Sequence, residues 1–360
     1  MEETHSVRIK NGLILPWKDS TNMGGVLDKT NRYIEASQYN GDWLKLGNQY
    51  DLGSDIIVEK HEKCIYLGFF IEHWGHYLID CLGRAWYLNN QKYKDYRVVF
   101  LSKDSDKITG NYLRLLELLG GNQEQICIVK RPTRFDEVVI PCMATDSEYN
   151  FDNSWVEMWN RIVANAIITK VPLKVYLSRQ KFGTAKNKEF GEQDIEMQFV
   201  SNGYDVMYPE LLSLDEQISI FSTCDSVACI NGTIPLNVLF KGSNALELIV
   251  INKTSLPHNN LKMACRAVNI MPKYIDAFFE PFKGIPSNLG EGPYWMIPDG
   301  DLKSFLEKNG MQYFEINSSK GKTYFKYTLL CLKAEGRKIL RMMIKHMPLK
   351  KQVKKLIRWH

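Results

Sequence analysis

The sequence of 360 residues has no uninterrupted apolar run close to the ~18 residues that suggest a membrane-spanning helix. It also opens without the basic and then apolar stretch of a secretory leader, so we expect neither a signal peptide nor a transmembrane segment. None of its eight cysteines forms a Cys-x-x-Cys pair, and no histidine stands at zinc-ligand spacing from them. These absences favour buried free thiols in a reducing cytoplasm.

Several catalytic signatures are missing as well. The chain has no Walker loop, no dinucleotide-binding glycine fingerprint and no Gly-x-Ser-x-Gly elbow. Asp-x-Asp pairs occur at Asp104-Ser105-Asp106 and Asp299-Gly300-Asp301, but two such pairs are close to chance in a chain of this length, so we predict no metal site. The 44% hydrophobic and 12% aromatic content is that of a globular protein, and the length suggests two domains.

The net charge of +5 hides a strong asymmetry. Residues from Lys320 to His360 hold 13 bases and one acid, which leaves 33 bases and 40 acids for the rest of the chain. Apolar residues recur at helical spacing among these bases, and this pattern suits an anionic membrane surface. The alternative is a solvated helix that packs its apolar stripe on the body. We do not expect nucleic acid as a partner, because the body is acidic and lacks a basic-aromatic surface motif.

Hydrophobic patterning predicts an α/β protein. In the first half we expect irregular structure over residues 1–60, strands at 64–70, 96–101, 126–129 and 137–140, and helices at 74–89, 112–119 and 155–166. In the second half we expect strands at 175–178, 205–207, 226–230 and 245–250, helices at 192–201, 213–221, 235–240 and 302–308, and a long loop at 284–300. Strands that alternate with helices imply a parallel, doubly wound sheet. We therefore predict an N-terminal α/β domain over 1–165, a second over 170–318 and a basic amphipathic tail over 319–360.

The densest group of titratable residues lies between Glu72 and Asp80, directly after a predicted strand. His76 and Asp80 are four residues apart, so a helix would place them on one face, where the carboxylate can orient the imidazole of a general base. His73 is a second candidate, and Asp80 acting directly is a third. Both histidines could instead be structural groups at the start of a helix.

Two further strand ends carry groups suited to phosphate. Ser178-Arg179 follows one strand, and an arginine there can grip a phosphate with two parallel hydrogen bonds. Asn231-Gly232-Thr233 follows another strand and precedes a helix, so its backbone N–H groups favour a diphosphate. Ligands bind at the carboxyl ends of strands in open α/β sheets, which supports a site formed by these segments.

Four segments, taken in order, resemble the family 61 glycosyltransferases of the capsular polysaccharide type. They are His73–Asp80, Tyr176–Arg179, Leu212–Phe221 and Ile230–Leu248. The resemblance implies a GT-B architecture of two facing Rossmann-like domains. It also implies an inverting transfer from a nucleotide sugar, which we expect to be UDP-linked, with no cofactor and no obligatory metal.

The resemblance also extends the set of donor-binding candidates. It recommends Gln217, Asn237 and Glu247 beside Ser178, Arg179, Asn231, Gly232 and Thr233. The chain departs from the family at Asn231, where a histidine is usual, and after Arg179, where lysines replace a further arginine.

We therefore expect a glycosyltransferase that builds a surface polysaccharide on a glycan or lipid-linked acceptor. With the basic tail at 324–360, we expect it in the cytoplasm, bound peripherally to the inner membrane face. Two alternatives are a polysaccharide pyruvyltransferase and a non-enzymatic scaffold that lost activity with the change at position 231.

Overall fold

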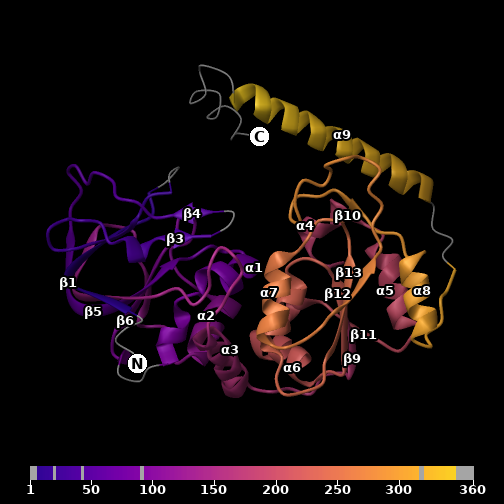
Figure 1. Ribbon diagram of the computed structural model, residues 1–360, viewed down its shortest axis with the longest axis horizontal. Helices are drawn as coiled ribbons and strands as arrows, with labels where there is room; N and C mark the ends of the chain where they lie inside the picture. The colour runs from indigo at the N-terminus through magenta and orange to yellow at the C-terminus, as the bar shows by residue number, and fades with distance from the viewer. Residues whose placement is uncertain (1–5, 19–21, 42–43, 90–92, 316–319, 346–360) are drawn as a thin grey trace.

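The computed structural model describes residues 6–18, 22–41, 44–89, 93–315 and 320–345. In this range the chain forms two α/β units, each built around its own sheet, and a long C-terminal helix (Figure 1). The predicted α/β class is confirmed.

The first unit contains a six-stranded mixed sheet. In spatial order its strands are β2 (Gly25–Leu27), β1 (Ser6–Leu15), β8 (Thr133–Pro141), β5 (Val58–Phe69), β6 (Arg97–Leu101) and β7 (Ile126–Ile128). The last four of these are parallel, whereas β1 pairs antiparallel with β2 and β8. The prediction of irregular structure over residues 1–60 is therefore wrong. A polar first half conceals β1 in the sequence, although its last four residues are fully buried.

Smaller elements cover this sheet. One face carries the two-stranded ribbon of β3 (Tyr39–Asn40) and β4 (Lys45–Leu46) beside a short 3-10 turn, η2 (Glu35–Ser37). The other face carries α2 (Gly110–Leu118) and α3 (Asn153–Asn165), both predicted. Asp152 caps α3 by accepting hydrogen bonds from the backbone N–H groups of Ser154 and Trp155. The chain then crosses to the second unit over residues 166–173.

The predicted helix over 74–89 is broken into three short pieces. They are α1 (Trp74–His76), a π-helical turn η3 (Tyr77–Cys81) and a 3-10 turn η4 (Ala85–Asn89). The break falls where Arg84 is buried, because its guanidinium donates hydrogen bonds to the carbonyls of Ala36, Gln38 and Pro141. A continuous helix could not turn this side chain inward while keeping Leu78 and Leu82 in the core.

The second unit is built on a fully parallel sheet. Its spatial order is β11 (Asp205–Met207), β9 (Lys174–Leu177), β12 (Ser226–Ile230), β13 (Glu247–Asn252) and β14 (Lys273–Asp276). Counted along the chain this order is 2-1-3-4-5, the arrangement of a doubly wound fold. The direction of winding reverses between β9 and β12, and ligands bind doubly wound sheets at that point.

Helices cover both faces of this sheet. On one face lie α5 (Glu192–Val200) and α8 (Asp301–Lys308), and on the other α6 (Leu214–Thr223), η7 (Ile234–Phe240) and α7 (Asn259–Ala267). The capping box predicted at the start of α6 is confirmed, since Ser213 and Glu216 exchange hydrogen bonds. The sequence patterns missed α7 and β14.

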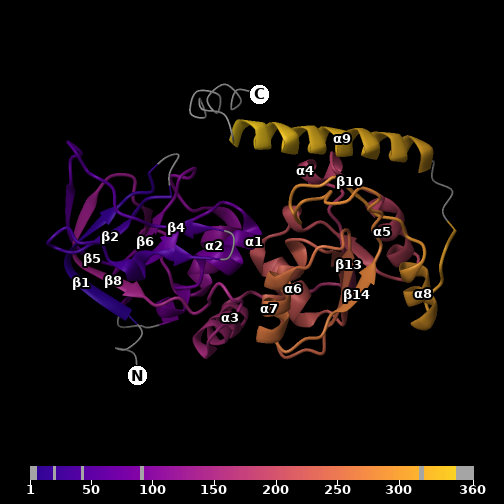
Figure 2. The same ribbon diagram turned by 45° about the horizontal axis from the view of Figure 1, so that its top comes forward.

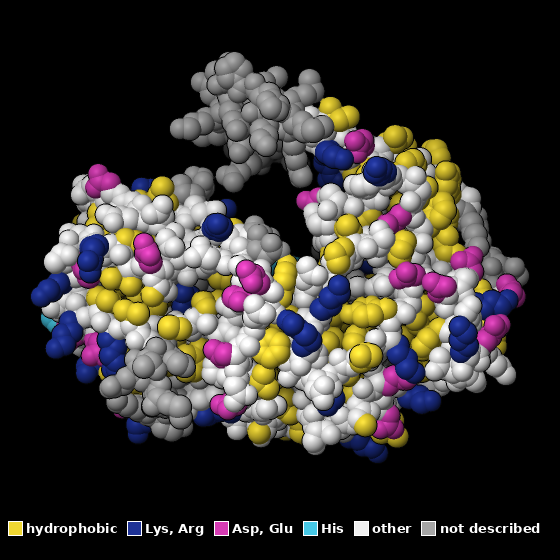
Figure 3. Space-filling view, viewed as in Figure 1, with side chains coloured by type: hydrophobic (Ala, Val, Ile, Leu, Met, Phe, Trp, Pro, Cys, Tyr) yellow, Lys and Arg dark blue, Asp and Glu magenta, His cyan; other side chains and the backbone are white. Residues whose placement is uncertain are grey.

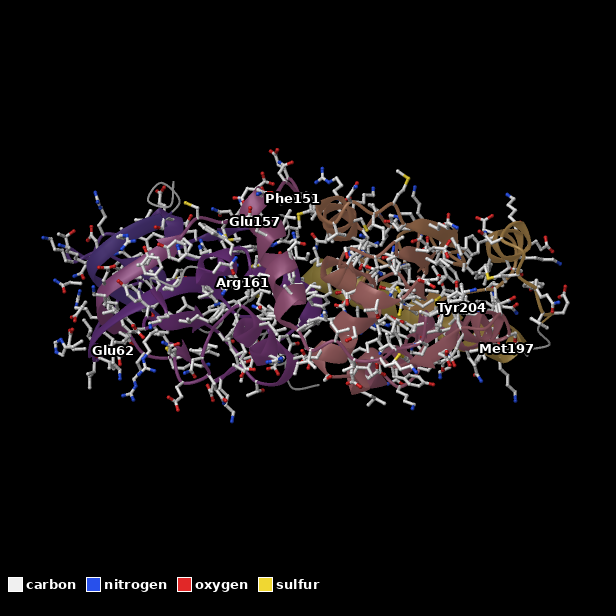
Figure 4. All side chains as sticks on the ribbon, turned by 90° about the horizontal axis from the view of Figure 1, so that it is seen from below. Glu62, Phe151, Glu157, Arg161, Met197 and Tyr204 are labelled. Carbon is white, nitrogen blue, oxygen red and sulfur yellow. The ribbon has the colours of Figure 1, made fainter. Side chains whose placement is uncertain are left out.

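The two units share a core. A single cluster of buried side chains runs from the first sheet through α2 and α3 to α6, η7, α7 and the second sheet. At its centre Trp159 of α3 meets Phe240 of η7 edge to face, with ring centroids 5.7 Å apart. Glu157 and Arg161 mark α3 near the middle of the molecule in Figure 4, between the ends marked by Glu62 and Met197.

The predicted loop over 284–300 contains a strand, β15 (Tyr294–Trp295), which pairs in parallel with β10 (Glu189–Phe190) next to α4 (Gly183–Lys186). Beyond it, α9 (Lys320–Lys345) runs along the second unit toward the border between the units (Figures 1 and 2). Its Tyr327 and Cys331 are fully buried against Trp295 and Ile285. Of the described helices, none is both long and apolar enough to cross a membrane. The predicted tail from residue 346 onward lies outside the described residues.

Candidate active site

Three strand ends meet at the point where the second sheet reverses its winding. Arg179 follows β9, Asn231 and Gly232 follow β12, and Lys253 follows β13. Because these strands are parallel and in register, their carboxyl ends open on the same edge of the sheet. The structure therefore brings together two segments that the sequence predicted and one that it did not.

A buried ion cluster organises this edge. Glu189 of β10 accepts from Arg179 Nε at 3.0 Å and from Lys253 Nζ at 2.8 Å, and the side chains of Glu189 and Lys253 are each only 2% exposed. Burial alone would raise the pKa of Glu189, but Lys253 and Arg179 together lower it. Burial lowers the pKa of Lys253 to about 8 in spite of Glu189. The cluster holds two bases and one acid.

The two cations of this cluster, Arg179 and Lys253, lie next to Gly232. A Cβ placed on Gly232 would stand 3.6 Å from Arg179 Nη1 and 3.6 Å from Lys253 Nζ. The backbone after β12 is therefore flanked by two cations, an arrangement suited to an anion. The predicted two-point grip by Arg179 needs correction, however, because Nε and Nη2 already donate to Glu189, which leaves Nη1 directed at the glycine.

A second chain of polar groups fixes Asn231. Its amide nitrogen donates to Asn252 Oδ1 at 2.8 Å, and Asn252 in turn donates to Asp276 at 2.7 Å. Its amide oxygen lies 2.8 Å from Nδ1 of His258, which therefore donates. Burial and then the nearby Lys253 lower the pKa of His258 to about 4, so the ring is neutral at pH 7. The family resemblance expects an imidazole at position 231, and here His258 supplies an imidazole that is hydrogen-bonded to Asn231.

The predicted histidine segment faces this edge from the first unit. Gly75 lies against Thr233, since a Cβ on Gly75 would stand 3.4 Å from the Thr233 hydroxyl. Partial desolvation, and then the charges of His76 and Arg179, lower the pKa of His73, which places that ring within electrostatic reach of the cation cluster. Figure 3 shows the surface hollowed between the two units, and α1 lies at their border (Figures 1 and 2).

The predicted pairing of His76 with Asp80 is confirmed. His76 Nδ1 lies 2.7 Å from Asp80 Oδ2, and the Tyr39 hydroxyl donates to Asp80 Oδ1. Burial first, and then Asp80, raise the pKa of Tyr39 so far that it stays a donor. The carboxylate is thus held by two partners while it orients the imidazole, which is what a histidine general base requires.

Other predicted residues have different surroundings. Asn237 accepts a hydrogen bond from the Trp74 indole at 2.7 Å and donates to Gln217 at 2.8 Å, so this pair ties α1 to the second unit. Ser178 is buried, and its hydroxyl accepts from the backbone of Gln180. Ser178, Gln217 and Asn237 are therefore buried residues that stabilise the segments carrying the site.

Glu247 does not reach the site. It pairs with Ser226 at the first position of β13, whereas Asn231 follows the last position of β12, so Glu247 lies at the opposite edge of the sheet. Its carboxylate contacts Ser226 and Lys273 there. The prediction that it faces the donor is therefore wrong, because a short sequence motif does not reveal which end of a strand a residue occupies.

Five site residues escaped the sequence analysis, namely Tyr39, Glu189, Glu192, Lys253 and His258. Lys253 could have been found, because it comes three residues after the predicted strand at 245–250, much as Arg179 comes after the strand at 175–178. Tyr39, Glu189 and His258 are contributed by short or irregular segments that carry no periodic signal, whereas Glu192 begins a predicted helix whose pattern does not show that it contacts Arg179. Burial raises the pKa of Glu192 to about 7, although the backbone N–H of Arg179 donates to its carboxylate.

Among the described residues, no three His, Cys, Asp or Glu side chains are grouped so that they could hold a metal ion. The two Asp-x-Asp pairs have other environments. Asp106 is 91% exposed and pairs with Lys130, and Asp301 lies in the first turn of α8.

The fold and these contacts define an α/β protein whose doubly wound second unit carries two cations at its switch point, with a histidine–aspartate pair on the neighbouring unit. Residues 74–246 match the family model Glycosyltransferase 61. This match supports a glycosyltransferase of family 61 and, with it, glycosyltransferase activity for the chain. The matched segment includes His76, Asp80, Arg179 and Gly232. No curated protein matches the chain.

Proposed function

We propose that the chain transfers a sugar from a UDP-linked donor to a glycan or lipid-linked acceptor, with inversion and without a metal. The two units would act as the facing domains of a GT-B enzyme in the synthesis of a surface, capsular polysaccharide. One observation carries the proposal: the oriented His76 of the first unit stands across the Gly75–Thr233 contact from the cations at Gly232.

The chemistry follows from the two sides of this contact. The acceptor hydroxyl loses its proton to His76 Nε2 as its oxygen bonds to the anomeric carbon. The bond from that carbon to the donor phosphate breaks, and the electron pair leaves with the nucleoside diphosphate. Arg179 Nη1 and Lys253 stabilise the departing charge, and Asp80 stabilises the imidazolium.

Turnover of single variants tests the base. His76→Ala and Asp80→Asn should lower the rate with saturating substrates by about 10²–10⁴-fold, the usual worth of a general base. His61→Ala is the matched control, because that histidine is 89% exposed on β5 and should leave the rate unchanged. If His76→Ala and Asp80→Asn both keep more than about a tenth of the rate, the pair is structural.

Calorimetry with UDP tests the anion site. Arg179→Ala should weaken binding at least tenfold, because a hydrogen bond between charged groups contributes about 1.5–3 kcal/mol. Arg179→Lys keeps the charge and should retain part of the affinity. A donor panel that includes phosphoenolpyruvate completes the test, since turnover of that compound alone would favour the pyruvyltransferase alternative.

We also propose that the outer face of α9 binds an anionic membrane surface at the cytoplasmic side. Phe325, Leu329, Leu332 and Ile339 recur at helical spacing and are 66%, 50%, 62% and 47% exposed. Lys322, Lys333 and Arg337 are exposed on the same helix and would meet lipid headgroups, at about 1 kcal/mol for each cation near the surface.

The inner face of α9 constrains how this is tested. Because Tyr327 and Cys331 pack on the body, deletion of the helix would expose core as well as remove the anchor. The combined change of Phe325, Leu329 and Leu332 to Gln should instead abolish binding to phosphatidylserine vesicles while the melting transition stays in place. Met271→Gln, which removes a side chain of a residue 92% exposed on the body, is the control. Unchanged vesicle binding by the triple variant would contradict the membrane proposal.

A further inference from the structure

A cavity of about 300 Å³ is lined by residues of both units and has Asp80 in its wall. Its walls on the first unit come from Asn40, Asp80, Thr145 and Tyr149, and α7 of the second unit contributes Asn260. The volume is at the lower end of the range of about 300–1,000 Å³ typical of ligand pockets. Asp80 therefore belongs both to the base pair and to the wall of this cavity.

The lining has a distinctive chemistry. Hydroxyl, amide and carboxylate groups alternate with Tyr149, Met143 and Met263, and none of the described lining residues is a lysine or arginine. The ionisable carboxyl groups are those of Asp80 and Asp146. A phosphate or uronate would meet only acids here, whereas the hydroxyls and apolar face of a neutral sugar match amides, carboxylates and an aromatic ring.

The loop that carries Tyr149 is held in one shape. Asp146 accepts hydrogen bonds from the backbone N–H groups of Glu148 at 2.8 Å and Asn150 at 2.9 Å. Tyr149 adopts a left-handed backbone with φ of 62°, which is uncommon for a bulky residue, and its carbonyl accepts from Arg266 of α7. The loop is thus tied to the helix that forms the opposite wall.

The same helix links the cavity to the anion site. His258, two residues before Asn260, bonds Asn231 at the donor edge, while Asn260 lines the cavity. On the first unit, Asp80 both lines the cavity and bonds His76. A ligand in the cavity would therefore contact the carboxylate that orients the proposed base.

From this geometry we infer that the cavity is a subsite for the acceptor chain and that it takes an uncharged glycosyl unit. The ring lies against Tyr149 and Met263 and one hydroxyl contacts Asp80. Because His76 does not line the cavity, this unit is one that precedes the reacting unit along the acceptor, and it anchors the acceptor beside the base pair. The inference rests on the proposed function for the direction of transfer, but the cavity's preference for neutral sugars is a separate property that binding alone can measure.

Ligand-detected NMR on the full chain tests it, with methyl glycosides of neutral hexoses and N-acetylhexosamines, methyl glucuronide and glucose 1-phosphate as probes. At least one neutral glycoside should bind, and the two anions should bind at least tenfold more weakly. Asn260→Ala should weaken the neutral probe about 3- to 10-fold, the value of one lost hydrogen bond. Lys262→Ala, at an exposed position two residues along α7, should not change it.

A charge reversal sharpens the result. Asn260→Lys should admit methyl glucuronide and reduce its disadvantage against the neutral probe. Equal binding by Asn260→Ala and the unchanged chain, tighter binding of an anionic probe to the unchanged chain, or no binding of any glycoside overturns the inference. UDP binding measured on the same samples separates the two ideas. If the chain binds UDP but no glycoside, the assignment of the cavity alone is contradicted. If it binds glycosides but not UDP, the proposed function is contradicted.

Discussion

The substitution Glu189→Gln tests the electrostatics of the buried ion cluster at the proposed donor site. In the folded chain this carboxylate is the shared partner of Arg179 and Lys253, and it is almost fully buried. Glutamine keeps the shape but leaves two cations together. Removal of one partner from a buried ion pair costs about 3–5 kcal/mol of folding free energy.

The effect should depend on pH with a defined sign. Lys253 has a folded pKa of about 8 against an ordinary value of 10.5, so the folded state already sheds this proton more readily than the unfolded state does. Loss of Glu189 lowers that pKa further. Below pH 8 the destabilisation of Glu189→Gln that is due to charged Lys253 grows by up to about 1.4 kcal/mol for each pH unit. Above pH 8 this part vanishes, because Lys253 is neutral in both the variant and the unchanged chain. The destabilisation should therefore be about 2–3 kcal/mol larger at pH 6 than at pH 9.

Urea unfolding followed by tryptophan fluorescence at pH 6, 7 and 9 measures both quantities. Glu315→Gln is the control, because its carboxylate is 80% exposed and pairs with Lys303 at 3.5 Å, a contact worth less than about 1 kcal/mol. The double variant Glu189→Gln, Lys253→Met should recover stability at pH 6. A loss below about 1 kcal/mol that is equal at pH 6 and pH 9 would refute the reasoning, since it would mean that solvent reaches the cluster.

Three more outcomes are expected. The wild-type chain should lose about 3 kcal/mol of folding free energy as pH falls from 6.5 to 4, because the folded state keeps His258 neutral. His258→Asn should remove this loss from the pH profile of the melting temperature. Glu192 acts oppositely: its folded pKa of about 7 lies above the ordinary 4.5, so its contribution is lost as pH rises between those values, and Glu192→Gln should flatten that part of the profile. Asn237→Ala should cost about 2–3 kcal/mol in urea unfolding, since Trp74 and Gln217 each lose a buried hydrogen-bond partner.

The sequence patterns correctly predicted the features that depend on residues close together in the chain. The spacing of His76 and Asp80 placed the pair correctly even though the helix is only one turn of α followed by a π turn, because both forms keep residues four apart on one side. The carboxyl ends of β9 and β12 were predictable for a similar reason. Hydrophobic runs define buried parallel strands, and the residue after each run must lie at an edge.

What depends on long-range contacts was missed. Nothing in the polar stretch around Glu189 indicates that it will be buried, because its burial follows from pairing of β10 with β15 more than a hundred residues later. His258 lies in an irregular segment before α7, and only the packing of that helix brings it to Asn231. The prediction for Glu247 was wrong for a different reason. Its strand was assigned correctly, but the assignment did not show that Glu247 lies at the edge of the sheet opposite Asn231.

The shared core bears on how the site works. Motion of one unit against the other would have to separate Trp159 from Phe240, break the Arg114–Asp215 ion pair at 2.9 Å and disrupt the Trp74–Asn237 hydrogen bond. Buried aromatic contacts of this kind are worth about 0.5–1.5 kcal/mol beyond the area that they bury, so together these contacts oppose a wide opening. The hollow between the units in Figure 3 lies on the side away from α3. Substrates should therefore enter from that side, near the end of α9 that approaches the border. If α9 binds a membrane as proposed, an acceptor in that membrane would lie beside the site without any rearrangement of the core.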